Sequence, residues 1–142
     1  MRGEKEMKDR MAEGRHPLFL DGQFHDSVSS ETIPVVNPAT EDVIARIPEC
    51  TAEEVQQAVH AAQRAQAPWA KLPAVQRAGY IRKIAQGIRE NADRLARVIT
   101  EEQGKILSLA RVEVEFTADY MEYMAEWARR YEGEILQSDR PN

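Results

Sequence analysis

The feature that most constrains this sequence is a long helical segment, about 106 to 132, that carries apolar residues over a wide arc. Its main stripe follows helical spacing and consists of Leu109, Val112, Phe116, Tyr120, Met124, Trp127 and Tyr131. Further residues widen that stripe, namely Val114, Met121, Ala125 and Ala128. A helix that is apolar over so wide an arc is buried on more than one side. The aromatic residues are then either core or the lining of a pocket for a small organic substrate.

The content of large apolar residues limits how much core the chain builds alone. Leu, Ile, Val and Phe together make up 29 of the 142 residues, about a fifth. That share is near the limit at which an independent core becomes doubtful. Alanine supplies much of the remaining apolar content, and each alanine buries little area. The composition predicts a layer that packs on other structure and exposes apolar surface when it is alone.

Two β-hairpins are expected at the start of the chain, after a charged, mobile arm over residues 1–15. Asp21-Gly22 between apolar residues is a strong hairpin signal, because both turn positions favour positive φ. A second strand pair is expected at 33–36 and 43–47, joined by a turn-forming stretch. Its prolines restrict both strands to sheet edges.

The remainder predicts about four helices, so this segment is mainly α. Thr51 and Glu54 form a capping box for the first helix, which is expected to stop before Pro68. The second begins after Pro73, and its buried face is Ala78, Ile81, Ala85 and Ile88. The third runs from about Ala92 to Gln103 and ends at Gly104, and the fourth is closed by Gly133. Residues 134–138 are expected to begin a strand.

Charge and cysteine content exclude several functional classes. The net charge of −5 argues against non-specific nucleic-acid binding, which depends on neutralised phosphates. No run of eighteen apolar residues predicts a membrane span, and residues 1–15 lack the apolar core of a secretory signal. The single cysteine, Cys50, excludes an internal disulfide framework and favours a reducing, cytoplasmic setting.

The residues by themselves indicate no catalytic, cofactor-binding or metal-binding group. The seven glycines are too scattered for a G-x-G-x-x-G turn. The three histidines lie far apart in sequence and in unlike elements, whereas a zinc site needs clustered ligands. Cys50 lies among Glu49, Glu53 and Glu54, which oppose thiolate formation, so we interpret it as structural.

Three stretches together resemble the aldehyde dehydrogenase superfamily, over roughly residues 17–142. The first is Ile33-Pro34-Val35-Val36-Asn37-Pro38-Ala39-Thr40-Glu41-Asp42-Val43-Ile44. The second is the helix pair around 61–65, Trp69 and Arg77. The third combines Glu101-Glu102-Gln103-Gly104-Lys105 with 123–133, and together with 135–141 it looks most like bacterial lactaldehyde and glycolaldehyde dehydrogenases.

This resemblance implies an α/β parent fold with a Rossmann-like NAD domain, a catalytic domain and an oligomerisation hairpin. The implied reaction oxidises a small aldehyde such as lactaldehyde or glycolaldehyde, with NAD or NADP as the acceptor. The family's catalytic Cys, Glu and Asn and its cofactor motifs are absent here and would follow residue 142. Residues 16–142 are therefore expected to be an incomplete N-terminal part of the dehydrogenase domain, inactive alone.

The resemblance also implies roles for four residues of this sequence. Phe116 matches a position that lines the substrate tunnel in related enzymes, and Tyr120 lies one turn further on. Val36 and Glu102 match positions that hold a structural monovalent cation in some relatives.

Two alternatives to an inactive segment stay open. One is an acidic helical interaction module that binds a partner through 106–132. The other is one half of a split enzyme. The expected partner is the missing C-terminal portion of the enzyme or a second copy of this chain.

Overall fold

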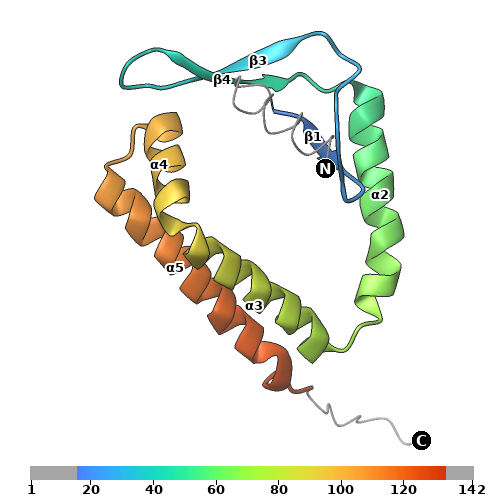
Figure 1. The fold of residues 1–142 in the computed structure, drawn as a ribbon. Coiled ribbons are helices and arrows are strands. Elements are labelled where there is room, and N and C mark those ends of the chain that lie inside the picture. Colours follow the sequence, from blue (N-terminus) through green and yellow to red (C-terminus); the bar gives the residue numbers. More distant parts are fainter. Residues whose placement is uncertain (1–15, 134–142) are drawn as a thin grey trace, which may run out of the picture.

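The structure is a computed structural model that describes residues 16–133, in which two short hairpins precede four α-helices (Figure 1). Strand β1 (Leu18–Leu20) pairs antiparallel with β2 (Gln23–His25). The turn residues Asp21 and Gly22 have φ values of 50° and 80°. Positive φ at both positions confirms the predicted Asp-Gly hairpin. The predicted arm at 1–15 and strand at 134–138 lie outside the described residues.

The second hairpin joins β3 (Thr32–Val36) to β4 (Val43–Pro48). The side chain of Asn37 organises its turn, because Oδ1 accepts the backbone N–H of Ala39 at 2.9 Å. The ladder has an irregularity between Val35 and Val36. Each sheet has two strands, so β3 and β4 are edge strands, as their prolines predicted.

Helix α2 (Ala52–Ala70) begins at the predicted capping box. Thr51 Oγ1 accepts the backbone N–H of Glu54 at 3.2 Å, and Glu54 Oε2 accepts that of Thr51 at 2.9 Å. The predicted end is wrong, because the helix continues through Pro68 to Ala70. Pro68 lies close to the helix end, where its missing N–H costs one hydrogen bond and the surrounding residues are exposed to solvent.

Helix α3 (Ala74–Glu90) begins where it was predicted, and α4 (Ala92–Gln103) has both predicted ends. Pro73 precedes α3, and Gly104 ends α4 with a φ of 70°, as expected for a left-handed C-cap. Helix α5 (Leu107–Glu126) is shorter than predicted. Its end tightens into a 3₁₀ turn, η1 (Trp127–Arg129), in which Arg130 N donates to Trp127 O at 2.9 Å. Gly133 is therefore not the residue that closes α5.

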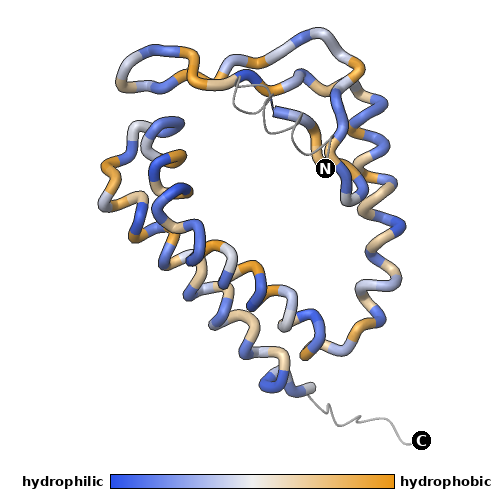
Figure 2. Tube along the Cα trace, in the orientation of Figure 1, coloured by the Kyte–Doolittle hydropathy of each residue, from blue (hydrophilic) through white to orange (hydrophobic). Residues whose placement is uncertain are grey.

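Helix α5 packs along α3 and against α4, while α2 contacts β1 (Figure 1). The buried apolar residues are Ala78, Ala85, Ala92, Ala96, Ala110, Val114, Ala118 and Ala125. Such small side chains let the helices approach closely, but they bury little apolar area. No large side chain is fully buried among the described residues, and apolar segments are spread along the tube in Figure 2.

The packing corrects the prediction for the fourth helix. The side of α5 that is buried carries Ala110, Val114, Ala118 and Ala125. The main stripe predicted from sequence is exposed instead, with Phe116 at 65% and Tyr120 at 53%. In this chain α5 is buried on one side only, because the described residues supply a neighbour for the alanine side alone.

Ion pairs link α3 and α5 at the edge of their contact. Arg89 Nη1 and Nη2 donate to Glu122 Oε1 and Asp119 Oδ1, each at 2.6 Å. The hydrogen bond from Arg89 lowers the pKa of the Glu122 carboxyl, and the same contacts raise the pKa of Arg89. These side chains are partly exposed, so the pairs fix the helices' relative position more than they add to stability.

Within residues 16–133, no helix is both long and apolar enough to cross a membrane.

Candidate functional site

Four aromatic side chains follow one another along the exposed side of α5 and into the η1 turn that follows it. Phe116, Tyr120, Tyr123 and Trp127 form this aromatic row. Successive ring centroids are 6.2, 6.2 and 6.5 Å apart, within the range of stacked and edge-on contacts. Their exposed fractions lie between 44% and 65%. The row is an apolar surface with two phenol hydroxyls, suited to lining a pocket once another layer covers it.

Glu54 is the one buried charged residue in the described part of the chain, with 7% exposure. Its Oε1 accepts the backbone N–H of Val28 at 2.9 Å. Its Oε2 accepts hydrogen bonds from the Ser27 hydroxyl and from the backbone N–H of Thr51, each at 2.9 Å. The backbone N–H of Thr51, and then that of Val28, hold the pKa of the Glu54 carboxyl below 4.5. The carboxylate therefore joins the start of α2 to the loop after β2.

Sequence reasoning found only half of this arrangement. It predicted the bond between Glu54 and Thr51, because the capping box is a local motif. It missed Ser27 and Val28, which are more than 25 positions away in sequence. Ser27 and Val28 lie in a serine-rich loop of ordinary composition, so the sequence held no signal for this contact.

The structure places Cys50, His25 and His60 around the first hairpin and α2. Cys50 is a free, exposed thiol beside the Glu54 cap. His25 and His60 both line a cavity of about 460 Å³ between the first hairpin and α2. This shared cavity could not be predicted from the sequence, because it forms only when β1 packs on α2. Among residues 16–133, no group of three or more His, Cys, Asp or Glu side chains is placed to hold a metal ion.

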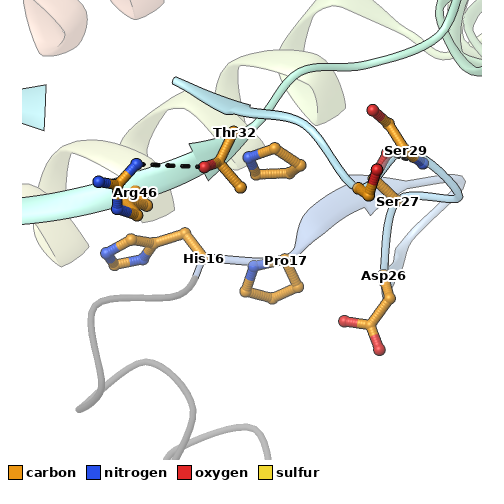
Figure 3. Close-up of a pocket in the computed structure, with 9 residues that line it drawn as sticks. His16, Pro17, Asp26, Ser27, Ser29, Thr32 and Arg46 are labelled. Atoms are coloured by element: carbon orange, nitrogen blue, oxygen red, sulfur yellow. Dashed lines mark hydrogen bonds between the residues drawn. The ribbon is translucent and has the colours of Figure 1, made fainter. Parts of the chain in front are cut away.

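A second cavity, of about 380 Å³, lies beside the hairpins and is lined mostly by polar residues (Figure 3). Arg46 Nη1 donates to Thr32 Oγ1 at 3.4 Å in its wall. Ser27 Oγ accepts the backbone N–H of Ser29 at 3.1 Å, and Ser29 Oγ accepts that of Glu31 at 3.1 Å. These hydroxyls are used in turn hydrogen bonds, a structural role common for serine in loops.

Comparison with known proteins identifies the fold to which these elements belong. The family model described as "Aldehyde dehydrogenase family" matches residues 24–142. The chain belongs to the aldehyde dehydrogenase family. This confirms the resemblance noted in the sequence, and the expected class of parent fold with it.

Lactaldehyde dehydrogenase of Escherichia coli is 59% identical over 127 residues, which are 89% of this chain and 26% of that enzyme. Its crystal structure superposes with a TM-score of 0.85. The 3,6-anhydro-α-L-galactose dehydrogenase of Vibrio sp. is 40% identical over 90% of this chain and 27% of its own length. A 3,6-anhydro-L-galactose dehydrogenase solved in complex with NAP gives a TM-score of 0.81.

This aldehyde dehydrogenase chain thus spans about a quarter of the length of the relatives that it matches. It corresponds to the N-terminal segment of the enzyme, with short strand pairs followed by helices.

The two proposed tunnel residues are neighbours in the aromatic row. The rings of Phe116 and Tyr120 are nearly parallel, with an interplanar angle of 20°. Both side chains are more than half exposed, so in this chain they border solvent. Their role in a substrate tunnel stays a prediction.

The two proposed cation positions lie on segments that the fold brings near each other. Val36 ends β3, and Glu102 lies in the last turn of α4. A Cβ at Gly104 would be 3.1 Å from Pro38 Cγ, so the loop after α4 lies against the turn after β3. The cation site itself stays a prediction.

The described residues do not fit a dinucleotide by themselves. A pyrophosphate binds where a glycine-rich turn exposes backbone N–H groups at a helix N-terminus. Glu53 and Glu54 occupy the first turn of α2, and their charge opposes phosphate. Pro73, Asn91 and Ile106 precede α3, α4 and α5, and none of them is a glycine.

Proposed function

We propose that the whole protein oxidises a small aldehyde, such as lactaldehyde or glycolaldehyde, to the acid, with NAD or NADP as acceptor. The observation that carries this proposal is the high identity with E. coli lactaldehyde dehydrogenase over most of this chain. Support for the acceptor comes from relatives solved in complex with NAP and, for a Staphylococcus aureus betaine aldehyde dehydrogenase, with NAD+.

The 142-residue chain alone is proposed to be inactive. Aldehyde oxidation of the implied kind needs a thiolate nucleophile, a base for deacylation and a nicotinamide held against the substrate. The one thiol, Cys50, is exposed, and the nearby Glu54 carboxylate is occupied by three hydrogen bonds. The catalytic Cys, Glu and Asn implied by the family belong to the part of its fold that this chain does not span.

A chimeric enzyme tests both statements. This chain replaces the matched segment of E. coli lactaldehyde dehydrogenase, and reduced nicotinamide is followed by absorbance with lactaldehyde or glycolaldehyde. We expect turnover by the chimera, retained in Cys50→Ser, and none by the isolated chain. Turnover by the isolated chain that disappears in Cys50→Ser would make Cys50 a nucleophile and overturn the proposal. A folded chimera without turnover would contradict the assigned activity.

The partner of this segment is proposed to be the remainder of the dehydrogenase, with residues 16–142 forming one incomplete domain. The exposed aromatic row favours the second candidate function as well, an interaction module that binds through α5. Mixing the isolated chain with the separately expressed remainder separates the two, since only a split enzyme regains turnover. We place the protein in the cytoplasm, because a single cysteine suits a reducing compartment.

A further inference from the structure

A small apolar cavity of about 240 Å³ lies between the start of α3 and the end of α5. Its lining is Trp69, Ala74, Arg77, Ala78, Ile81, Met124, Ala125 and Ala128. Arg77 is the one cationic residue of this set, and no acidic residue belongs to it. This cavity is separate from the aromatic row, although Met124 lies on the same helix.

The Nε atom of Arg77 is buried and has no hydrogen-bond acceptor among the described residues. Three exposed arginines in this part of the chain differ, since Arg64, Arg89 and Arg111 each contact a carboxylate. Buried donors in native proteins are nearly always paired, so an orphaned one calls for a specific explanation. An oxygen acceptor brought to this point would satisfy it.

The edge of the cavity is apolar and open to another layer. Trp69 is 36% exposed and Met124 is 47% exposed. An apolar edge around a single N–H donor fits a polypeptide segment that carries one oxygen acceptor beside an apolar side chain. Relatives of this chain have about three quarters of their length outside the matched part, which is the chain available to cover this edge.

We infer that this cavity is an anchoring point for the remainder of the aldehyde dehydrogenase chain, which places an oxygen acceptor on Arg77 Nε. The inference rests on the proposed function, because it takes the remainder of the enzyme as the occupant. Arg77 is a positioning residue in this scheme. It fixes the end of α5, and with it the aromatic row, relative to the rest of the enzyme.

The test compares Arg77→Met in two contexts, the isolated chain and the chimera with E. coli lactaldehyde dehydrogenase. Unfolding midpoints are followed by helical circular dichroism in urea. In the isolated chain the substitution removes an unpaired buried donor, so we expect an unchanged or higher midpoint. In the chimera it leaves a buried acceptor unpaired, so we expect a clearly lower midpoint. Arg97→Met, at an exposed position of α4, is the control and should change neither.

Further outcomes keep the inference apart from the proposed function. Arg77→Lys keeps the charge but not the Nε donor and should behave like Arg77→Met, whereas full rescue by lysine would overturn the hydrogen bond. If Arg77→Met changes the unfolding midpoint equally in the isolated chain and in the chimera, the cavity is not an anchoring point, even if the chimera is active. If Arg77→Met lowers the unfolding midpoint of the isolated chain, and lowers it more at higher protein concentration, the occupant of the cavity is a second copy of this chain. That result would also overturn the inference. A wild-type chimera that folds but lacks turnover would instead count against the proposed activity.

Discussion

At the scale of single residues, Glu54 has the most specific task in this chain. Its carboxylate accepts hydrogen bonds from Ser27, Val28 and Thr51, and so it holds the loop after β2 on the start of α2. Hydrogen bonds to the charged form stabilise that form, which is why the pKa of Glu54 is lowered. Other charged or titratable groups line the cavity beside it, namely Asp21, His25, Asp26, Glu53, His60 and Arg64.

Glu54→Gln should therefore destabilise the chain at pH 7. Because the folded-state pKa lies below the ordinary value of a glutamate, the contribution of Glu54 is present above that ordinary value and is lost as the pH falls through the lower folded-state value. Urea unfolding of wild type and variant should show a gap in unfolding free energy that closes in acid. Glu53→Gln, in the same helical turn, is the control and should show a smaller gap. A gap for Glu54→Gln that is independent of pH would show that the carboxylate charge is not what holds the loop.

Phe116 is the residue through which the proposed substrate tunnel is tested. In the active chimera, Phe116→Ala removes a large ring without touching a cofactor contact, so it should change the aldehyde preference more than the affinity for NAD. The measurement is kcat/KM for a short and a long aldehyde in parallel. Tyr131→Ala, at a position that is 90% exposed, is the control. If the ratio of the two kcat/KM values stays at that of the wild type, Phe116 has only a packing role.

At the scale of elements, the close approach of the last three helices depends on alanine. Ala85 on α3 and Ala110 and Ala118 on α5 have no exposed surface. A larger side chain at such a contact forces the helices apart, since cores tolerate extra volume poorly.

Ala118→Leu should therefore destabilise the helical unit, by about 1–3 kcal/mol if it behaves as a typical overpacking substitution. Ser108→Leu, at an exposed position of the same helix, adds the same side chain without the crowding and is the control. Urea unfolding followed by helical circular dichroism measures both. Equal stability of the two variants would mean that α3 and α5 are not packed through this alanine.

At the scale of the whole molecule, residues 16–133 expose apolar surface and bury no large side chain fully among themselves. The aromatic row, Leu109 and Val112 together form a long exposed side of α5. Soluble monomers rarely expose a continuous apolar patch of this kind.

We expect the isolated chain to associate into dimers or higher oligomers, or to adopt a loosely packed state that binds an apolar dye. Light scattering during size-exclusion chromatography and dye fluorescence measure the two behaviours. Tyr120→Glu within the row should reduce both, whereas Thr117→Glu on the same helix should have less effect. A monodisperse monomer with a sharp thermal transition and no dye binding would contradict this expectation.

The sequence by itself determined the elements whose signals are local. Asp21-Gly22 specified a turn with positive φ, Thr51 and Glu54 specified a helix start, and Gly104 specified a helix end. Each of these signals involves residues within a few positions of one another, so backbone sterics and capping hydrogen bonds decide them. The resemblance to an aldehyde dehydrogenase could likewise be recognised from the sequence, because it depends on the order of short stretches along the chain.

Only the tertiary structure decided which side of α5 is buried. Both sides are apolar, so hydrophobic periodicity cannot choose between them. The alanine side packs against α3 and α4, because small residues let helices approach closely. The aromatic row therefore stays exposed. The extension of α2 through Pro68, the bonds from Ser27 and Val28 to Glu54, and the unpaired Arg77 Nε depend in the same way on surroundings that local sequence does not specify.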